Sequence, residues 1–157
     1  MTDSQSKAKK YAFKLLVYRG RSEKELKERL VKKGISKAVA SSTVQDLKRL
    51  GLIDDRSLAE TLKREALSRK FLSQQGAIRF LHQRGIPHEI INDALNGDET
   101  IDIYTARRLV HKKINNLRNY SPLHVKKKLY GLLARRGYSS DTIRKVLKEK
   151  SFQEEDS

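Results

Sequence analysis

Apolar residues recur at helical spacing along most of the chain. Leu26 and Leu30 are four residues apart, and Val125, Leu129 and Leu133 continue the same interval in a distant segment. This spacing places each set on one face of an α-helix, with charged residues on either side. The sustained alternation of apolar and polar residues that is typical of strands is missing. The pattern therefore predicts an all-α fold of thin helices packed in small bundles.

Capping residues and glycines give the predicted ends of these helices. Ser22 with Glu25 fits a capping box, and Ser121 is followed by Pro122 at a first helical position. Glycines follow most of the periodic segments, where a helix end favours a left-handed residue. Nine helices are predicted, at residues 7–19, 22–33, 36–50, 55–70, 73–84, 87–95, 98–118, 122–136 and 139–149.

The helix pattern repeats three times. Gly34, Gly85 and Gly137 are 51 and 52 residues apart, and each has an apolar residue four and eight positions before it and an apolar or aromatic residue directly after it. Periods of this length indicate tandem structural units. We expect three three-helix repeats that form an elongated, curved array. Their predicted ranges are 1–50 with a basic N-terminal segment, 51–97 and 98–150, followed by an acidic tail at 151–157 that frays.

The amino-acid composition excludes several classes of protein and favours a polyanionic partner. The chain has 157 residues and no cysteine, which excludes a disulfide scaffold and a thiolate metal site. No apolar run approaches the ~20 residues that cross a bilayer, so no membrane is expected and a reducing cytoplasm is the expected setting. Lys and Arg number 35 against 19 Asp and Glu, a net charge of +16. Such a charge favours a polyanionic partner, most often nucleic acid, with an acidic protein groove or anionic membrane surface as alternatives.

The positive charge lies mainly in the two end repeats. Residues 1–50 carry a net charge of +9, residues 51–97 carry +1 and residues 98–157 carry +6. Part of this charge is an ordinary solvated helix surface, as the mixed signs of Lys24, Lys27 and Glu28 indicate. The rest predicts contacts to DNA phosphates or to a protein–DNA filament. The candidate binding residues are Arg21, Lys24, Lys32, Lys33, Arg107, Arg108, Lys112, Lys113, Lys126, Lys127, Lys128, Arg135 and Arg136.

The sequence has few features of a catalytic site or a metal-binding site. The four histidines form no i, i+4 pair, and no phosphate-binding loop or nucleophile elbow occurs. The pair Asp54–Asp55 is interpreted as a helix start, with one residue as the cap and the other complementing the helix dipole. We expect no enzyme, no cofactor and no metal. Tyr120 is expected to be exposed and able to stack on a base, whereas Tyr138 is expected to pack in the core.

A helix-turn-helix reader of DNA sequence is also disfavoured. In that motif the helix after the turn carries Arg, Asn or Gln to base edges. Here the helices after the three glycines have small, mixed or acidic residues. Contact with the backbone of DNA, or with protein, fits this sequence better.

The three repeats, the stretch from Leu50 to Asp55 and the steps Arg84-Gly85-Ile86 and Arg136-Gly137-Tyr138 resemble the RecX family. The resemblance covers about residues 11–150, although Ser73 stands where the family often has glycine. It implies a monomeric regulator of homologous recombination that binds the groove of the RecA–DNA filament and mostly inhibits ATP hydrolysis and strand exchange. The implied partners are the RecA recombinase filament and single- and double-stranded DNA, bound without sequence preference. The alternative is a sequence-neutral nucleic-acid-binding module that acts without a filament.

Overall fold

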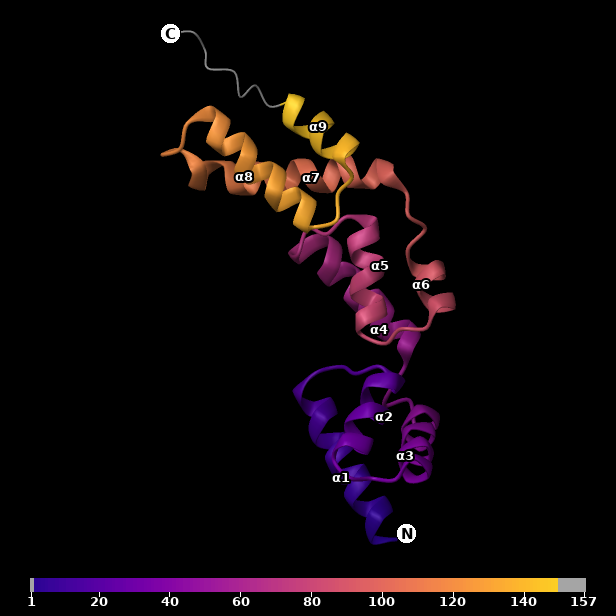
Figure 1. The fold of residues 1–157 in the computed structure, drawn as a ribbon. Coiled ribbons are helices and arrows are strands. Elements are labelled where there is room, and N and C mark those ends of the chain that lie inside the picture. Colours follow the sequence, from indigo (N-terminus) through magenta and orange to yellow (C-terminus); the bar gives the residue numbers. More distant parts are fainter. Residues whose placement is uncertain (1, 150–157) are drawn as a thin grey trace. The chain divides into compact units, whose positions relative to one another are not determined.

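The structure, a computed structural model, describes residues 2–149, and the regular secondary structure in that range consists of helices alone (Figure 1). The α-helices are α1 (Asp3–Tyr18), α2 (Glu23–Lys32), α3 (Lys37–Arg49), α4 (Asp55–Arg64), α5 (Gln74–Gln83), α6 (His88–Ala94), α7 (Glu99–Ile114), α8 (Pro122–Arg135) and α9 (Ser140–Glu149). A π-helical turn, η1 (Glu65–Arg69), follows α4, and a 3₁₀ turn, η2 (Asn115–Leu117), follows α7. The predicted all-α fold is confirmed. The predicted acidic tail at 151–157 lies outside the described residues.

Most helix ends follow the predicted caps. The backbone N–H of Glu25 donates to the Ser22 hydroxyl, and the N–H of Ser22 donates to the Glu25 carboxylate, both at 3.1 Å. The first helix differs from its prediction because it begins at Asp3 rather than at residue 7. A second capping box, between Thr2 and Gln5, starts it there. This box satisfies backbone donors that would otherwise have no partner in the first turn.

The chain divides into two compact units. Unit 1 comprises the residues up to Leu62 together with Leu81–Ala94, and unit 2 comprises Lys63–Phe80 together with the residues from Leu95 onward. In unit 1, α1, α2 and α3 pack into a bundle around Leu26, Leu30 and Leu47, which are fully buried. In unit 2, α7, α8 and α9 pack around a core that includes Leu109, Leu129, Leu133 and Ile143. Leucines at the predicted helical spacing thus form both cores.

The three repeat glycines end their helices in the left-handed region. The φ angles are 103° at Gly34, 79° at Gly85 and 95° at Gly137. A residue with a Cβ adopts this conformation only at a cost, which explains glycine at each helix end. Tyr138, directly after the third glycine, is buried as predicted.

One non-glycine residue among those described also has a positive φ. Phe71, which follows η1, has φ 53° and is buried in the core of unit 2. Its carbonyl accepts a hydrogen bond of 2.7 Å from the Tyr138 hydroxyl. This bond and the surrounding core hold Phe71 in a conformation that costs about 1–3 kcal/mol when isolated.

None of the helices within residues 2–149 combines the length and the hydrophobicity that a bilayer crossing requires.

Candidate nucleic-acid interface

The three consecutive lysines of α8 lie on its exposed side. Lys126, Lys127 and Lys128 are exposed, whereas Val125 and Leu129, on either side of them in sequence, are buried in unit 2. The helix period therefore separates an anchoring face from a cationic one. This arrangement leaves the three ammonium groups available to an anion.

An aromatic cluster accompanies the α8 lysines. The Lys128 ammonium lies 4.6 Å from the centroid of the Tyr120 ring, and that ring stacks on His124 with centroids 5.8 Å apart. Tyr120 remains 46 % exposed, in agreement with its prediction. A cation next to an exposed ring is typical of surfaces that bind phosphate and base together.

The basic residues of α7 have unequal surroundings. Arg108 and Lys112 are exposed and lie 5.5 and 5.2 Å from the centroid of Phe71. Arg107 instead forms an ion pair with Glu149, with 2.6 Å between its Nη2 and the carboxylate Oε1. This hydrogen bond raises the pKa of Arg107 above its usual value. Lys113 is half-buried. Arg108 and Lys112 are therefore the two α7 cations that the structure leaves most available.

The two arginines at the end of α8 also differ. Arg135 is exposed. The guanidinium of Arg136 donates to the carbonyl of Lys70. Arg136 therefore connects the end of α8 to the segment before α5 within unit 2.

In unit 1, the predicted lysines are exposed but the predicted arginine is not. Lys24, Lys32 and Lys33 are exposed, and the Lys33 ammonium lies 5.2 Å from the Tyr11 ring centroid. Arg21 is only 8 % exposed, because it stands in the short connection between α1 and α2, directly before the buried Ser22 cap. Direct contact of these residues with DNA, including Arg21, remains a prediction.

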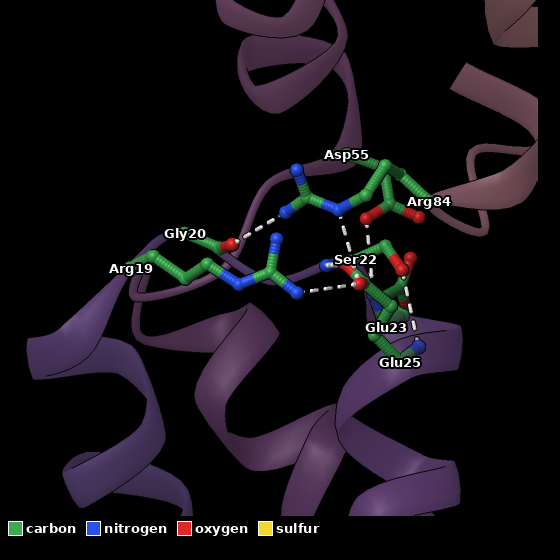
Figure 2. A network of polar contacts seen from close by, with 7 residues as sticks. All are labelled: Arg19, Gly20, Ser22, Glu23, Glu25, Asp55 and Arg84. Carbon is green, nitrogen blue, oxygen red and sulfur yellow. Dashed lines mark hydrogen bonds and ion pairs between the residues drawn. The ribbon is translucent and has the colours of Figure 1, made fainter. Parts of the chain in front are cut away.

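A network of polar contacts joins the start of α2 to later helices of unit 1 (Figure 2). The Glu25 carboxylate accepts from Arg84 Nε at 3.1 Å and from Arg19 Nη2 at 3.4 Å. Arg84 also donates to the carbonyl of Gly20 at 3.0 Å. Asp55 accepts from the backbone N–H of Glu23 at 3.0 Å, which satisfies a donor in the first turn of α2. We call Ser22, Asp55, Arg84 and Gly85 the first junction.

The same arrangement recurs in unit 2. Asp102 accepts from the backbone N–H of Gln74 at 2.8 Å, and the Ser73 hydroxyl accepts from the N–H of Gly76 at 2.9 Å. A Cβ on Gly137 would lie 2.6 Å from the Ser73 hydroxyl, as one on Gly85 would lie 2.7 Å from that of Ser22. We call Ser73, Asp102, Arg136 and Gly137 the second junction. Each junction connects the second helix of one repeat with the first two helices of the next.

The sequence interpretation missed the role of Asp55. Asp54 is the cap of α4, as predicted, because its carboxylate accepts from the N–H groups of Arg56 and Ser57. Asp55 lies in the first turn of α4, as predicted, but its carboxylate also accepts from the first-turn N–H of Glu23 in α2. Ser22 and Ser73 are 51 residues apart, the same interval as Gly34 and Gly85, which pointed to a shared role for the serines but not to Asp55.

Burial of Asp55 gives a prediction about pH. Removal of its carboxylate from water raises its pKa from 3.8 to about 6, although the N–H of Glu23 opposes this shift. The native state therefore binds the proton more tightly than the unfolded chain does. The contribution of Asp55 to stability is full below pH ~4 and is lost as the pH rises through 6.

We therefore expect Asp55→Asn to be more stable than the parent near pH 7, by about 1–2 kcal/mol, because the amide oxygen keeps the bond to Glu23 without a buried charge. Near pH 4 this advantage should vanish. Urea unfolding followed by circular dichroism at both pH values measures it. A variant less stable than the parent near pH 7 would show that the ionised carboxylate stabilises α2.

The fold and its junctions define a class: an array of tandem three-helix repeats with exposed basic helices. Two family models match, "RecX, first three-helix domain" at residues 8–47 and "RecX, third three-helix domain" at residues 102–147. The chain is similar to the regulatory protein RecX of Amycolatopsis mediterranei (strain U-32), with 31% identity over 91% of this chain and 82% of that protein. It is 34% identical to that of Chlorobaculum tepidum, over 91% of this chain and 88% of the relative.

A crystal structure of RecX from Lactobacillus salivarius has the same fold, with a TM-score of 0.73 and 25% identity over 95% of this chain and 97% of that chain. The chain belongs to the RecX family of regulatory proteins. The resemblance found in the sequence and the tandem repeat architecture are thereby confirmed. Proteins of this family are non-enzymatic regulators, and membership of the family implies regulation of RecA.

Proposed function

We propose that this chain binds the groove of the RecA–DNA filament and inhibits ATP hydrolysis and strand exchange. The observation that carries the proposal is the exposed cationic side of α8, where Lys126, Lys127 and Lys128 project from a helix anchored by Val125 and Leu129. Membership of the RecX family supplies RecA as the partner. The protein acts by binding, as a monomer and without a cofactor.

The DNA contacts of this function are made to phosphates rather than to bases. Lysine ammonium groups attract phosphate as point charges, and each neutralised phosphate releases counterions. The helices after the repeat glycines are poor readers of sequence: α9, for example, buries Ile143, Val146 and Leu147 and exposes Arg144 beside Asp141. Such an interface binds any DNA sequence, single- or double-stranded.

Two assays test the function. The protein is added to RecA on single-stranded DNA, and ATP hydrolysis and strand exchange are followed. Binding to the filament and to bare DNA is then compared at the same salt concentration. We expect inhibition and tighter binding to the filament. Equal affinity for bare DNA and filament, without an effect on RecA, would favour the sequence-neutral nucleic-acid-binding module instead.

Binding to bare DNA should depend steeply on salt. Each phosphate contact contributes ~0.7–0.9 to the log–log slope of affinity against salt, so several contacts give a slope of several units. Titration of scrambled sequences at increasing salt measures both slope and specificity. A shallow slope, or a preference above about a hundredfold for one sequence, would contradict the phosphate interface.

A further inference from the structure

A cationic cavity lies in unit 1, between the second half of α1, the connection from α1 to α2, and the second half of α2. Its volume is about 570 Å³. The residues that line it are Tyr11, Lys14, Leu15, Tyr18, Arg19, Arg21 and Arg29. It is separate from the lysines of α8 that carry the proposed function.

The lining has four positive side chains and no carboxylate. Glu25, which is not part of the lining, pairs with one of its residues: the Glu25 carboxylate lies 3.4 Å from Arg19. The same carboxylate also pairs with Arg84 at 3.1 Å. Lys14, Arg21 and Arg29 make no ion pair within residues 2–149. The cavity therefore keeps a positive potential that Glu25 offsets only in part.

Arg21 is the central group of this cavity. The residue is only 8 % exposed, and its Nε is buried without a hydrogen-bond partner within the described part of the chain. Burial, and secondarily the charge of Arg19, lowers the pKa of Arg21. A buried charge without a partner is costly, and an anion in the cavity would remove that cost.

Two tyrosines complete the lining. Arg29 Nη2 lies 3.5 Å from the Tyr11 hydroxyl, and this contact, followed by the charges of Arg29, Lys33 and Arg21, lowers the pKa of Tyr11. Tyr18, the last residue of α1, is 83 % exposed although it lines the cavity. An exposed aromatic side chain thus lines the same cavity as three arginines.

We propose that this cavity binds one nucleotide, with its phosphate on Arg21 and Arg29 and its base stacked on Tyr18. Guanidinium groups match the geometry of phosphate oxygens, and an exposed tyrosine supplies a stacking surface for any base. The volume lies within the range of small-molecule sites. With a DNA strand as the source, the inference rests on the proposed function and adds a second DNA contact to it, whereas a free nucleotide would be a ligand beyond that function. The nucleotide comes either from a DNA strand or from the free pool.

The test uses the full chain and three probes at one salt concentration: a short oligothymidylate, ATP and an oligoglutamate peptide. The variants are Arg21→Gln, Arg29→Gln and Tyr18→Leu, with Tyr18→Phe as the conservative partner. Lys27→Gln is the matched control, since it removes one charge from the exposed side of α2 outside the cavity. Circular dichroism confirms that each variant is folded.

We expect Arg21→Gln and Arg29→Gln each to weaken the binding of the tighter-binding nucleotide probe by about tenfold or more relative to Lys27→Gln. Tyr18→Leu should weaken the binding of the same probe by about fivefold or more, and Tyr18→Phe should leave that affinity unchanged. Tighter binding of oligothymidylate identifies a strand as the source, and tighter binding of ATP identifies the free nucleotide. Without ligand, Arg21→Gln should raise the melting temperature, because it removes an unpaired buried charge.

Two results would overturn the proposal. One is an effect of Arg21→Gln and Arg29→Gln no larger than that of Lys27→Gln. The other is equally tight binding of oligoglutamate with no loss in Tyr18→Leu, which would assign the cavity to acidic segments of a protein.

Discussion

Replacement of Gly137 by alanine is expected to destabilise unit 2 by about 2–5 kcal/mol. The left-handed φ of 95° is unfavourable for alanine by about 1–2 kcal/mol. In addition, the new Cβ would lie 2.6 Å from the Ser73 hydroxyl and 3.1 Å from the backbone Cα of Gly76. Ser73 cannot turn away without loss of its hydrogen bond from the N–H of Gly76, and the overpacking adds about 1–3 kcal/mol. Urea unfolding followed by circular dichroism measures the change.

Gly34 provides the matched control, because it ends the corresponding helix of the first repeat. Its φ of 103° is equally left-handed, but a Cβ there would meet no atom within 4 Å. Gly34→Ala should therefore lower the free energy of unfolding only by the cost of a left-handed φ for alanine, about 1–2 kcal/mol. Equal losses in the two variants would show that the second junction has room for a methyl group.

Replacement of Lys126, Lys127 and Lys128 by glutamate should weaken binding to DNA by about a hundredfold or more and abolish inhibition of strand exchange. The change alters the charge by six units on the exposed side of α8. If each lysine neutralises a phosphate, the slope of log affinity against log salt should also fall by about two to three. The buried Val125 and Leu129 are untouched, so the helix should remain folded. Binding titrations at several salt concentrations measure both quantities.

A triple variant on α9 controls for long-range charge. Arg144, Lys145 and Lys148 are exposed in the same unit, and their replacement by glutamate changes the charge by the same amount. These residues are outside the predicted binding set, so the loss should be clearly smaller. Similar losses in both triples would mean that the net field of the protein, and not the α8 surface, determines affinity.

Local spacing was sufficient to predict the helices and the repeats. The leucines of α2 and α8 recur every four residues, close to the helical period, and the glycines that end α2, α5 and α8 recur every 51 or 52 residues. Both signals can be read from spacing along the sequence. The start of α1 was missed because Thr2 and Gln5 form a capping box with little apolar pattern to point to it.

The candidate site was less predictable because it depends on contacts between distant residues. Arg21 is one of the candidate binding residues, and its low exposure of 8 % depends on the packing of unit 1. Asp55 was assigned to its own helix, yet it accepts from Glu23, 32 residues earlier in the chain. Neither pairing follows from composition or spacing, although the parallel intervals between the serines and between the glycines pointed to a shared junction.

The two sides of each junction are chemically different, so the order of the repeats along the chain matters. This asymmetry limits how such a chain evolves by duplication. Each junction takes a serine from the earlier repeat and an aspartate, an arginine and a glycine from the later one. A copy of the middle repeat inserted beside the original would keep every one of these partners. An exchange of the first and last repeats would not, because Lys33 stands where Arg84 and Arg136 precede their glycines. A lysine has no planar fork with which to replace those arginines, so repeat order is fixed by the chemistry of the junctions.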